Sequence, residues 1–216
     1  MRHYLAEGVG TFTLVFCGTG AIVINGATNG LLGHAGVAAT FGLTVMVLIE
    51  LLGDVSGAHF NPAVTLACWA TGRFAGRWVL GYLGSQVAGA VLASGLLRLL
   101  FPHAPDLGVT RPAGPAWAAF LLEVVLTFGL TFTILRAVAL SARKNFPIGL
   151  VVGAVVGIEA LLAGPFSGAS MNPARSLAPA LVSGNWVALW VYLLAPPLGA
   201  LAAALLFRQR RANLAA

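Results

Sequence analysis

The amino-acid sequence predicts an all-α membrane protein, with six transmembrane helices and two re-entrant half-helices in an inverted repeat. Three observations predict this fold class: the composition, the lengths of the apolar segments, and an internal repeat. Of the 216 residues, 59% are hydrophobic and only 8% are charged, whereas about a quarter of the residues in an average soluble protein are charged. So few charged residues cannot cover a water-facing surface, which indicates a chain embedded in a membrane.

Six apolar segments each approach the ~20 residues that a helix needs to cross the hydrocarbon core of a bilayer. These segments cover about 4–25, 34–53, 78–101, 115–136, 146–163 and 186–207. Two further segments, 61–71 and 172–182, have a helical pattern but reach only about 15 Å, roughly half of a bilayer. They are interpreted either as short helices in surface loops or as half-helices that enter the membrane and return.

The positions of lysine and arginine predict the orientation in the membrane. With the N-terminus inside, most basic residues lie on the cytoplasmic side, namely Arg2, Arg73, Arg77, Arg136, Arg143, Lys144, Arg208, Arg210 and Arg211. Arg98 and Arg111 fall outside, and Arg175 is left over. We therefore expect an integral, multi-pass protein whose two termini are both cytoplasmic.

The net charge of +6 does not indicate a nucleic-acid partner. The basic residues are scattered between apolar segments, and no basic run is interleaved with aromatic residues, as a nucleic-acid surface would require. The sequence shows neither metal-ligand spacing nor a pairing of nucleophile and base. We therefore expect no metal, no cofactor and no enzymatic activity.

The second half of the chain repeats the first. Glu7 matches Glu123, and the stretch SGAHFNPA at 56–63 matches SGASMNPA at 167–174. Each half holds three spans, so the second half must lie upside down relative to the first. Interrupted segments at matching places of an inverted repeat point to a site near the bilayer midplane.

We interpret the whole chain, 1–216, as one channel-like domain. Its first repeat covers about 4–101 and its second about 115–207.

The two Asn-Pro-Ala motifs have a physical logic. Asparagine is a favoured helix N-cap and proline is favoured at the first helical position. Each motif therefore predicts the start of a half-helix whose asparagine keeps its amide hydrogens free to donate outward. A single copy carries little information, but two copies in a repeated frame are specific. The six residues are Asn61, Pro62, Ala63, Asn172, Pro173 and Ala174.

Along nearly its whole length the chain resembles the aquaporin, or major intrinsic protein, family. The stretches that carry the resemblance are SGAHFNPAVT at 56–65 and NPARS at 172–176. The resemblance implies a homotetramer in the lipid bilayer that lets water and small uncharged solutes pass passively. It also implies that water turns its oxygen toward both asparagines, so that its hydrogens point away and no proton is relayed.

The resemblance further implies a constriction formed by Phe41, Ala160, Ala169 and Arg175. By this resemblance, Ala160 occupies a position at which strict water channels have a histidine. The smaller alanine predicts a wider constriction. The stretch 163–171 looks most like the nodulin-type plant channels and their bacterial relatives. That likeness implies glycerol, urea or neutral metalloid hydroxides as cargo, and we expect a bacterial inner membrane.

Two features depart from a dedicated glycerol facilitator. Ser176 occupies the position after the arginine at which glycerol facilitators have an aspartate by this resemblance. The outer loop at 102–114 is also short.

Acidic residues inside the spans are costly and need an explanation. Glu7 and Glu123 are interpreted as acceptors for backbone N–H groups of the loops that lead into the half-helices, with a proton relay as the alternative. Asp54 and His59 are placed in the inner vestibule. Glu159 is expected to face a neighbouring helix or subunit, with a pH gate through Glu159 or His59 as the alternative.

Two alternatives from other classes remain open. A secondary transporter also uses inverted repeats with broken helices, and it would show saturable, ion-coupled flux. A purely structural membrane protein would have a pore closed by side chains.

Overall fold

The computed structural model describes residues 1–144 and 146–213, and the side chains at 142–144 and 210–213 are not described. The sequence-based placement of the Arg143, Lys144, Arg210 and Arg211 side chains therefore lies outside the described part. The described chain contains α1 (Arg2–Ala27), α2 (Gly33–Ser56), α3 (Pro62–Ala70), a 3-10 turn (Gly76–Trp78), α4 (Val79–Leu100), α5 (Ala116–Lys144), α6 (Ile148–Ser167), α7 (Pro173–Ser183) and α8 (Leu189–Asn213).

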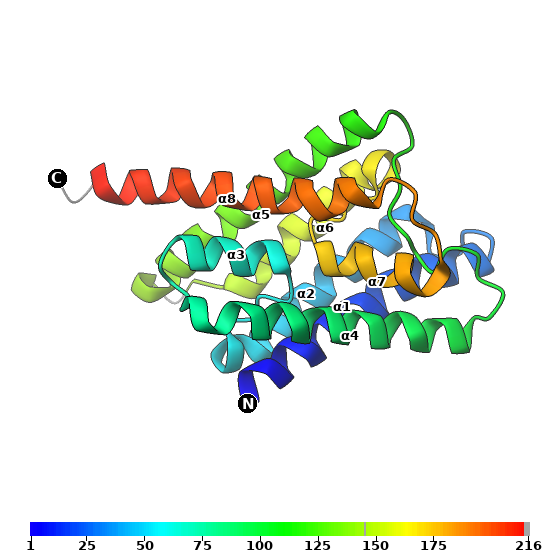
Figure 1. Ribbon diagram of the computed structural model, residues 1–216, viewed down its shortest axis with the longest axis horizontal. Helices are drawn as coiled ribbons and strands as arrows, with labels where there is room; N and C mark the ends of the chain where they lie inside the picture. Colours follow the sequence, from blue (N-terminus) through cyan, green and yellow to red (C-terminus); the bar gives the residue numbers. More distant parts are fainter. Residues whose placement is uncertain (145, 214–216) are drawn as a thin grey trace.

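Among the described residues, six helices are long and apolar enough to cross a membrane. They are α1, α2, α4, α5, α6 and α8. The remaining two α-helices, α3 and α7, lie end to end across the middle of the molecule (Figure 1). The predicted fold class is therefore confirmed, and α3 and α7 are half-helices rather than surface helices.

The sequence predicted most helix boundaries to within a few residues. The largest difference is in α5, which the apolar pattern ends at 136 but which continues to Lys144. Arg136 is exposed on this helix. Its charged side chain therefore lies outside the helix packing, and the helical backbone continues past it. A hydropathy pattern marks where the apolar surface ends, whereas a helix can continue beyond it.

Close contacts between helix backbones hold the two halves in matching arrangements. α1 packs on α4 and α5 packs on α8. A Cβ on Gly89 would lie 2.1 Å from the carbonyl oxygen of Gly8, and one on Gly199 would lie 2.3 Å from that of Val124. Small residues at such crossings are expected where lipid offers no hydrophobic driving force and packing decides association.

The two halves meet along α2 and α6. A Cβ on Gly42 would lie 2.7 Å from the carbonyl oxygen of Gly153, and one on Gly153 would lie 2.6 Å from that of Gly42. This reciprocal contact is what a pseudo-two-fold axis between two repeats produces. The loop at 101–115 lies at the end of the molecule opposite the C-terminus (Figure 1).

Candidate pore and its constriction

Each half-helix begins with an asparagine cap. The Oδ1 atom of Asn61 accepts from the backbone N–H of Ala63 at 2.9 Å, and Oδ1 of Asn172 accepts from that of Ala174 at 3.0 Å. Pro62 and Pro173 follow at the first helical positions, where a missing N–H costs nothing. The local sequence therefore sets where both half-helices start.

The two caps are joined crosswise at their tips. Nδ2 of Asn61 donates to the carbonyl oxygen of Met171 at 2.7 Å, and Nδ2 of Asn172 donates to that of Phe60 at 2.8 Å. An amide NH₂ carries two donors. One donor of each asparagine is therefore used between the halves, which corrects the expectation that the whole NH₂ group is free, and one donor remains.

The loops before the half-helices have an unusual backbone. Ala58 and Phe60 have φ values of 51° and 49°, and Ala169 and Met171 have 42° and 53°. Left-handed conformations cost about 1–2 kcal/mol for residues other than glycine. The surrounding structure must therefore hold these loops in place.

Glu7 holds the first of these loops. Its Oε1 accepts from Ser56 Oγ at 2.7 Å and from the N–H of His59 at 3.0 Å. Its Oε2 accepts from the N–H of Phe60 and from Gln86 Nε2, both at 2.7 Å. The carboxyl group thus collects four donors that would otherwise be buried without a partner.

Glu123 does the same in the second half. Its Oε1 accepts from Ser167 Oγ and the N–H of Ser170, and its Oε2 accepts from the N–H of Met171, each at 2.8 Å. A tyrosine also bonds to the start of each loop. Tyr82 donates to the carbonyl oxygen of Ser56 at 2.8 Å, and Tyr192 donates to that of Ser167 at 2.6 Å. The two loops are thus built to one plan.

A cavity of about 570 Å³ runs past both asparagines. The four residues that the sequence analysis assigned to a constriction all line it, as do the two assigned to a vestibule: Phe41, Ala160, Ala169, Arg175, Asp54 and His59. The wall between them is mostly apolar, and includes Leu14, Val45, Val64, Leu130, Val152 and Val156.

The guanidinium of Arg175 is fixed at this cavity. Its Nη1 donates to the carbonyl oxygen of Gly108 at 2.7 Å, and its Cζ lies 5.2 Å from the centre of the Phe41 ring. Nε is buried without a partner among the described residues. A guanidinium has five donors, and the bond to Gly108 uses one of them, so other donors remain at the cavity.

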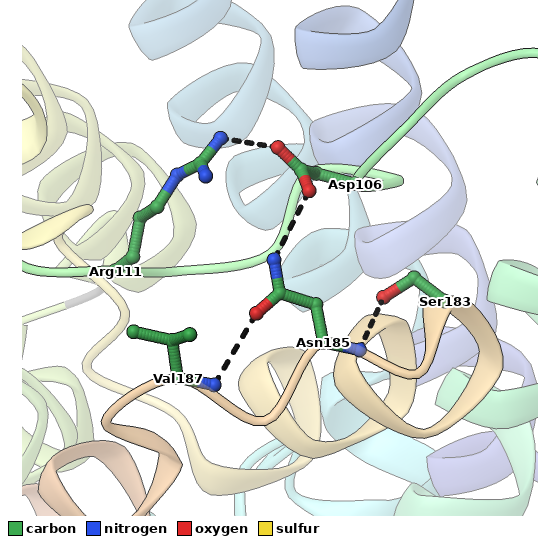
Figure 2. A network of polar contacts seen from close by, with 5 residues as sticks. All are labelled: Asp106, Arg111, Ser183, Asn185 and Val187. Carbon is green, nitrogen blue, oxygen red and sulfur yellow. Dashed lines mark hydrogen bonds and ion pairs between the residues drawn. The ribbon is translucent and has the colours of Figure 1, made fainter.

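The outer loop reaches Arg175 because polar contacts hold it down. Thr110 donates to Ser176 Oγ at 2.7 Å. Asp106 pairs with Arg111 and accepts from Asn185 Nδ2 at 3.0 Å, which joins the loop to the segment after α7 (Figure 2). The short loop at 102–114 does not line the cavity itself, but through Gly108 it positions Arg175 there.

Comparison with known proteins decides the family. The family model described as "Major intrinsic protein" matches residues 1–207. This chain belongs to the major intrinsic protein family. Like the family, it is a channel for water and small neutral solutes and not an enzyme, which confirms the main functional prediction and favours the channel over the transporter.

Several relatives of this major intrinsic protein are curated plant proteins. Aquaporin NIP1-1 from Zea mays is 46% identical over 208 residues, covering 94% of this chain and 73% of its own. Nodulin-26 from Glycine max is 40% identical over 205 residues, covering 94% and 76%. The X-ray structure of the aquaglyceroporin from Plasmodium falciparum superimposes with a TM-score of 0.87 at 25% identity, covering 99% of this chain and 97% of that one.

The other acidic residues of this major intrinsic protein lie in different surroundings. Asp54 is exposed and Glu50 lines the inner cavity, where its Oε1 accepts from the N–H of Gly149 at 3.1 Å. Glu159 is absent from the cavity wall. Its Oε1 lies 3.0 Å from where a Cβ on Gly129 would be, so it faces α5.

Sequence reasoning missed three residues that position the pore. A Cβ on Gly18 would lie 2.1 Å from the ring of Phe41, so this glycine makes room for a ring that lines the cavity. Gly108 supplies the carbonyl for Arg175, and Gln86 bridges Glu7 and Thr65. For Gln86 the repeat offered a signal that could have been used. When the two halves are aligned on Tyr82 and Tyr192, Gln86 matches Pro196, so it is a polar residue that the second half does not repeat.

Proposed function

We propose that this channel conducts water together with larger neutral solutes of the glycerol, urea and metalloid-hydroxide classes. The observation that carries the proposal is the pair Ala160 and Ala169 on the cavity wall. Both side chains end at Cβ, so they leave the space that a histidine at 160 would fill. A wide, largely apolar wall suits a solute with carbon as well as oxygen atoms.

Phe41, Ala160, Ala169 and Arg175 are proposed to form the constriction. What supports this is that all four line one cavity and that the Arg175 guanidinium lies against the Phe41 ring. One side of a solute would meet the donors of Arg175, and the other side would meet the aromatic and methyl surfaces. A fixed cation at this point also opposes the entry of other cations.

Exclusion of protons and ions is assigned to Asn61 and Asn172. Each caps a half-helix, so two positive dipole ends converge on the middle of the cavity. The amide hydrogens left after the crosswise bonds can donate to the oxygen of a single water. That water then points its hydrogens outward in both directions, which interrupts a proton relay.

The carboxylates Glu7 and Glu123 are proposed to be structural. Their support is the set of loop donors that each of them collects. His59 and Asp54 are proposed to line the inner vestibule. Because loop donors occupy the oxygens of each carboxylate, these groups are proposed to support the loops and not to relay protons.

The assembly and the orientation are also proposals. We propose a homotetramer, on the strength of the family. Cytoplasmic termini are supported by the excess of lysine and arginine on that side. The chain is treated as one domain, 1–216, with repeats at about 4–101 and 115–207. The two curated relatives named above come from plants and give the expected bacterial inner membrane no support.

Stopped-flow light scattering of reconstituted liposomes tests the proposal. Inward gradients of glycerol, urea and boric acid should each collapse faster with protein than with empty liposomes, and water should equilibrate faster as well. Flux should rise linearly with concentration and be independent of an ion gradient. Water flux without glycerol, urea or boric acid flux would overturn the wide constriction, and saturable, ion-coupled flux would favour the transporter.

A further inference from the structure

The hydroxyl of Thr65 lies at the centre of a small buried network beside the pore. Thr65 and Gln86 are both fully buried. Three polar atoms surround Thr65 Oγ1: the carbonyl oxygen of Asn61 at 3.0 Å, Nε2 of Gln86 at 3.0 Å, and Nδ1 of His59 at 3.1 Å. A hydroxyl has one hydrogen to give and two lone pairs to accept with. The roles of these contacts can therefore be worked out.

The orientation of the Gln86 amide is set by Glu7. Nε2 of Gln86 lies 2.7 Å from Glu7 Oε2, whose carboxyl group already accepts from two loop N–H groups. A reversed amide would place its oxygen against the carboxylate oxygen, which would bring two acceptors together. Gln86 therefore donates to both Glu7 and Thr65, and one lone pair of Thr65 Oγ1 is taken.

Thr65 has one hydrogen for two remaining contacts. The carbonyl oxygen of Asn61 can only accept, so a hydrogen bond there requires the Thr65 hydrogen. The contact with His59 is then a hydrogen bond only if Nδ1 of His59 carries a hydrogen. With the proton on Nε2 instead, Thr65 would donate to Nδ1, and its contact with Asn61 would have no hydrogen. The Asn61 carbonyl accepts from the backbone N–H of Thr65 in both arrangements, at 3.0 Å. The arrangement with the proton on Nδ1 is favoured because it gives the Thr65 hydroxyl three hydrogen bonds instead of two, and each is worth about 0.5–1.5 kcal/mol.

We propose that His59, when neutral, carries its ring proton on Nδ1 and meets the permeating molecule with Nε2 as a hydrogen-bond acceptor. This inference rests on the proposed pore function, because it places a hydrogen-bond acceptor on one side of that pore. His59 lines the cavity, and Nε2 makes no hydrogen bond with any described residue. The rings of Phe74 and Tyr82, at 5.0 and 5.3 Å, hold the imidazole in place.

The matching position in the second half is bonded differently. Ser170 aligns with His59 and also lines the cavity. Its hydroxyl donates to the carbonyl oxygen of Asn172 at 2.9 Å, lies 2.6 Å from Ser176 Oγ, and accepts from the N–H of Asn172 at 3.3 Å. Its hydrogen and both lone pairs are therefore used inside the protein. Of this matched pair, it is His59 that offers the cavity a side-chain acceptor.

The tautomer can be read directly by nuclear magnetic resonance. The full-length protein, labelled with ¹⁵N-histidine and reconstituted in lipid, is measured near pH 8, above the ordinary histidine pKa of about 6.5. The His59 signals are assigned by their loss in His59→Gln. We expect a protonated Nδ1 and an unprotonated Nε2. A protonated Nε2 overturns the proposal whatever the channel conducts, so this result does not depend on the proposed function.

A matched pair of variants tests Thr65 as the positioning residue. Thr65→Val removes the hydroxyl and should move the His59 proton toward Nε2, whereas Thr65→Ser keeps the hydroxyl and should leave the tautomer unchanged. Water permeability of Thr65→Val should fall by about two- to tenfold, the effect of one lost hydrogen bond. An unchanged tautomer in Thr65→Val would refute the role of Thr65. If Thr65→Val does not fold, the spectrum of the unaltered protein still decides.

Discussion

Asn185 donates a hydrogen bond from Nδ2 to Oδ1 of Asp106 at 3.0 Å, and this contact joins the outer loop to the segment after α7 (Figure 2). Two residues further along the loop, the carbonyl oxygen of Gly108 accepts from Arg175. The position of the guanidinium at the cavity is therefore coupled, through this loop, to the contact between Asn185 and Asp106.

Removing the Asp106 side chain is expected to change selectivity more than stability. In Asp106→Ala the loop loses Asn185 and Arg111, and Gly108 can move away from Arg175. The Arg111 side chain is 56% exposed, and exposed pairs contribute only about 0.2–1 kcal/mol. The ratio of glycerol to water permeability should change while the unfolding temperature stays nearly constant. Asp106→Asn, which keeps the acceptor for Asn185, is the control, and equal ratios in all three proteins would contradict this prediction.

Replacing Glu7 by glutamine is expected to impair folding. The amide has one acceptor oxygen where the carboxylate has two, and its NH₂ would face donors such as the Phe60 N–H. Each buried donor left without a partner costs about 1–3 kcal/mol. The yield of folded protein and the unfolding temperature should fall. Glu50→Gln is the control because Glu50 is exposed, and a stable, well-folded Glu7→Gln protein would sink the structural role.

Enlarging Gly18 is expected to narrow the constriction. Its added Cβ would meet the Phe41 ring at 2.1 Å, so the ring must move into the cavity. Gly18→Ala should therefore slow glycerol and urea more than water. Gly26→Ala on the same helix is the matched control, since nothing lies within 4 Å of its Cβ position. Identical solute permeabilities in the two variants would show that Phe41 does not limit passage.

Placing a histidine at Ala160 is expected to restrict the pore to water. The imidazole would fill space in the cavity that Ala160 and Ala169 both line. Glycerol permeability should fall by about tenfold or more, since each ~1.4 kcal/mol added to a barrier gives a factor of ten. Water permeability should persist. Ala160→Ser, which adds one small polar atom, is the control, and undiminished glycerol flux in Ala160→His would place the constriction elsewhere.

The sequence was sufficient for the fold because its signals are local or repeated. Span length, the cap chemistry of Asn61 and Asn172, and the matching frames each follow from short stretches of chain. They correctly predicted six spanning helices and two half-helices. The same reasoning placed Glu7 and Glu123 beside loops that need acceptors, since buried N–H groups must find partners.

The rest could not be predicted because it depends on contacts between distant segments. The carbonyl of Gly108 has no side chain to reveal that it holds Arg175. Gly18 resembles any other small residue in a membrane helix, and only its contact with Phe41 gives it a role. Gln86 is an isolated polar residue in α4, and its partners lie on α1 and α3. The end of α5 was misplaced because hydropathy reports the apolar surface and not the backbone hydrogen bonds.

The crosswise bonds from Asn61 to Met171 and from Asn172 to Phe60 also constrain the order of assembly. Their partners are 110 and 112 residues apart in the chain, so neither bond can form until the second half has been synthesised and inserted. Contacts between such distant positions form late, because the intervening chain must first be ordered. During biogenesis the first half therefore enters the bilayer before either of these two bonds can form.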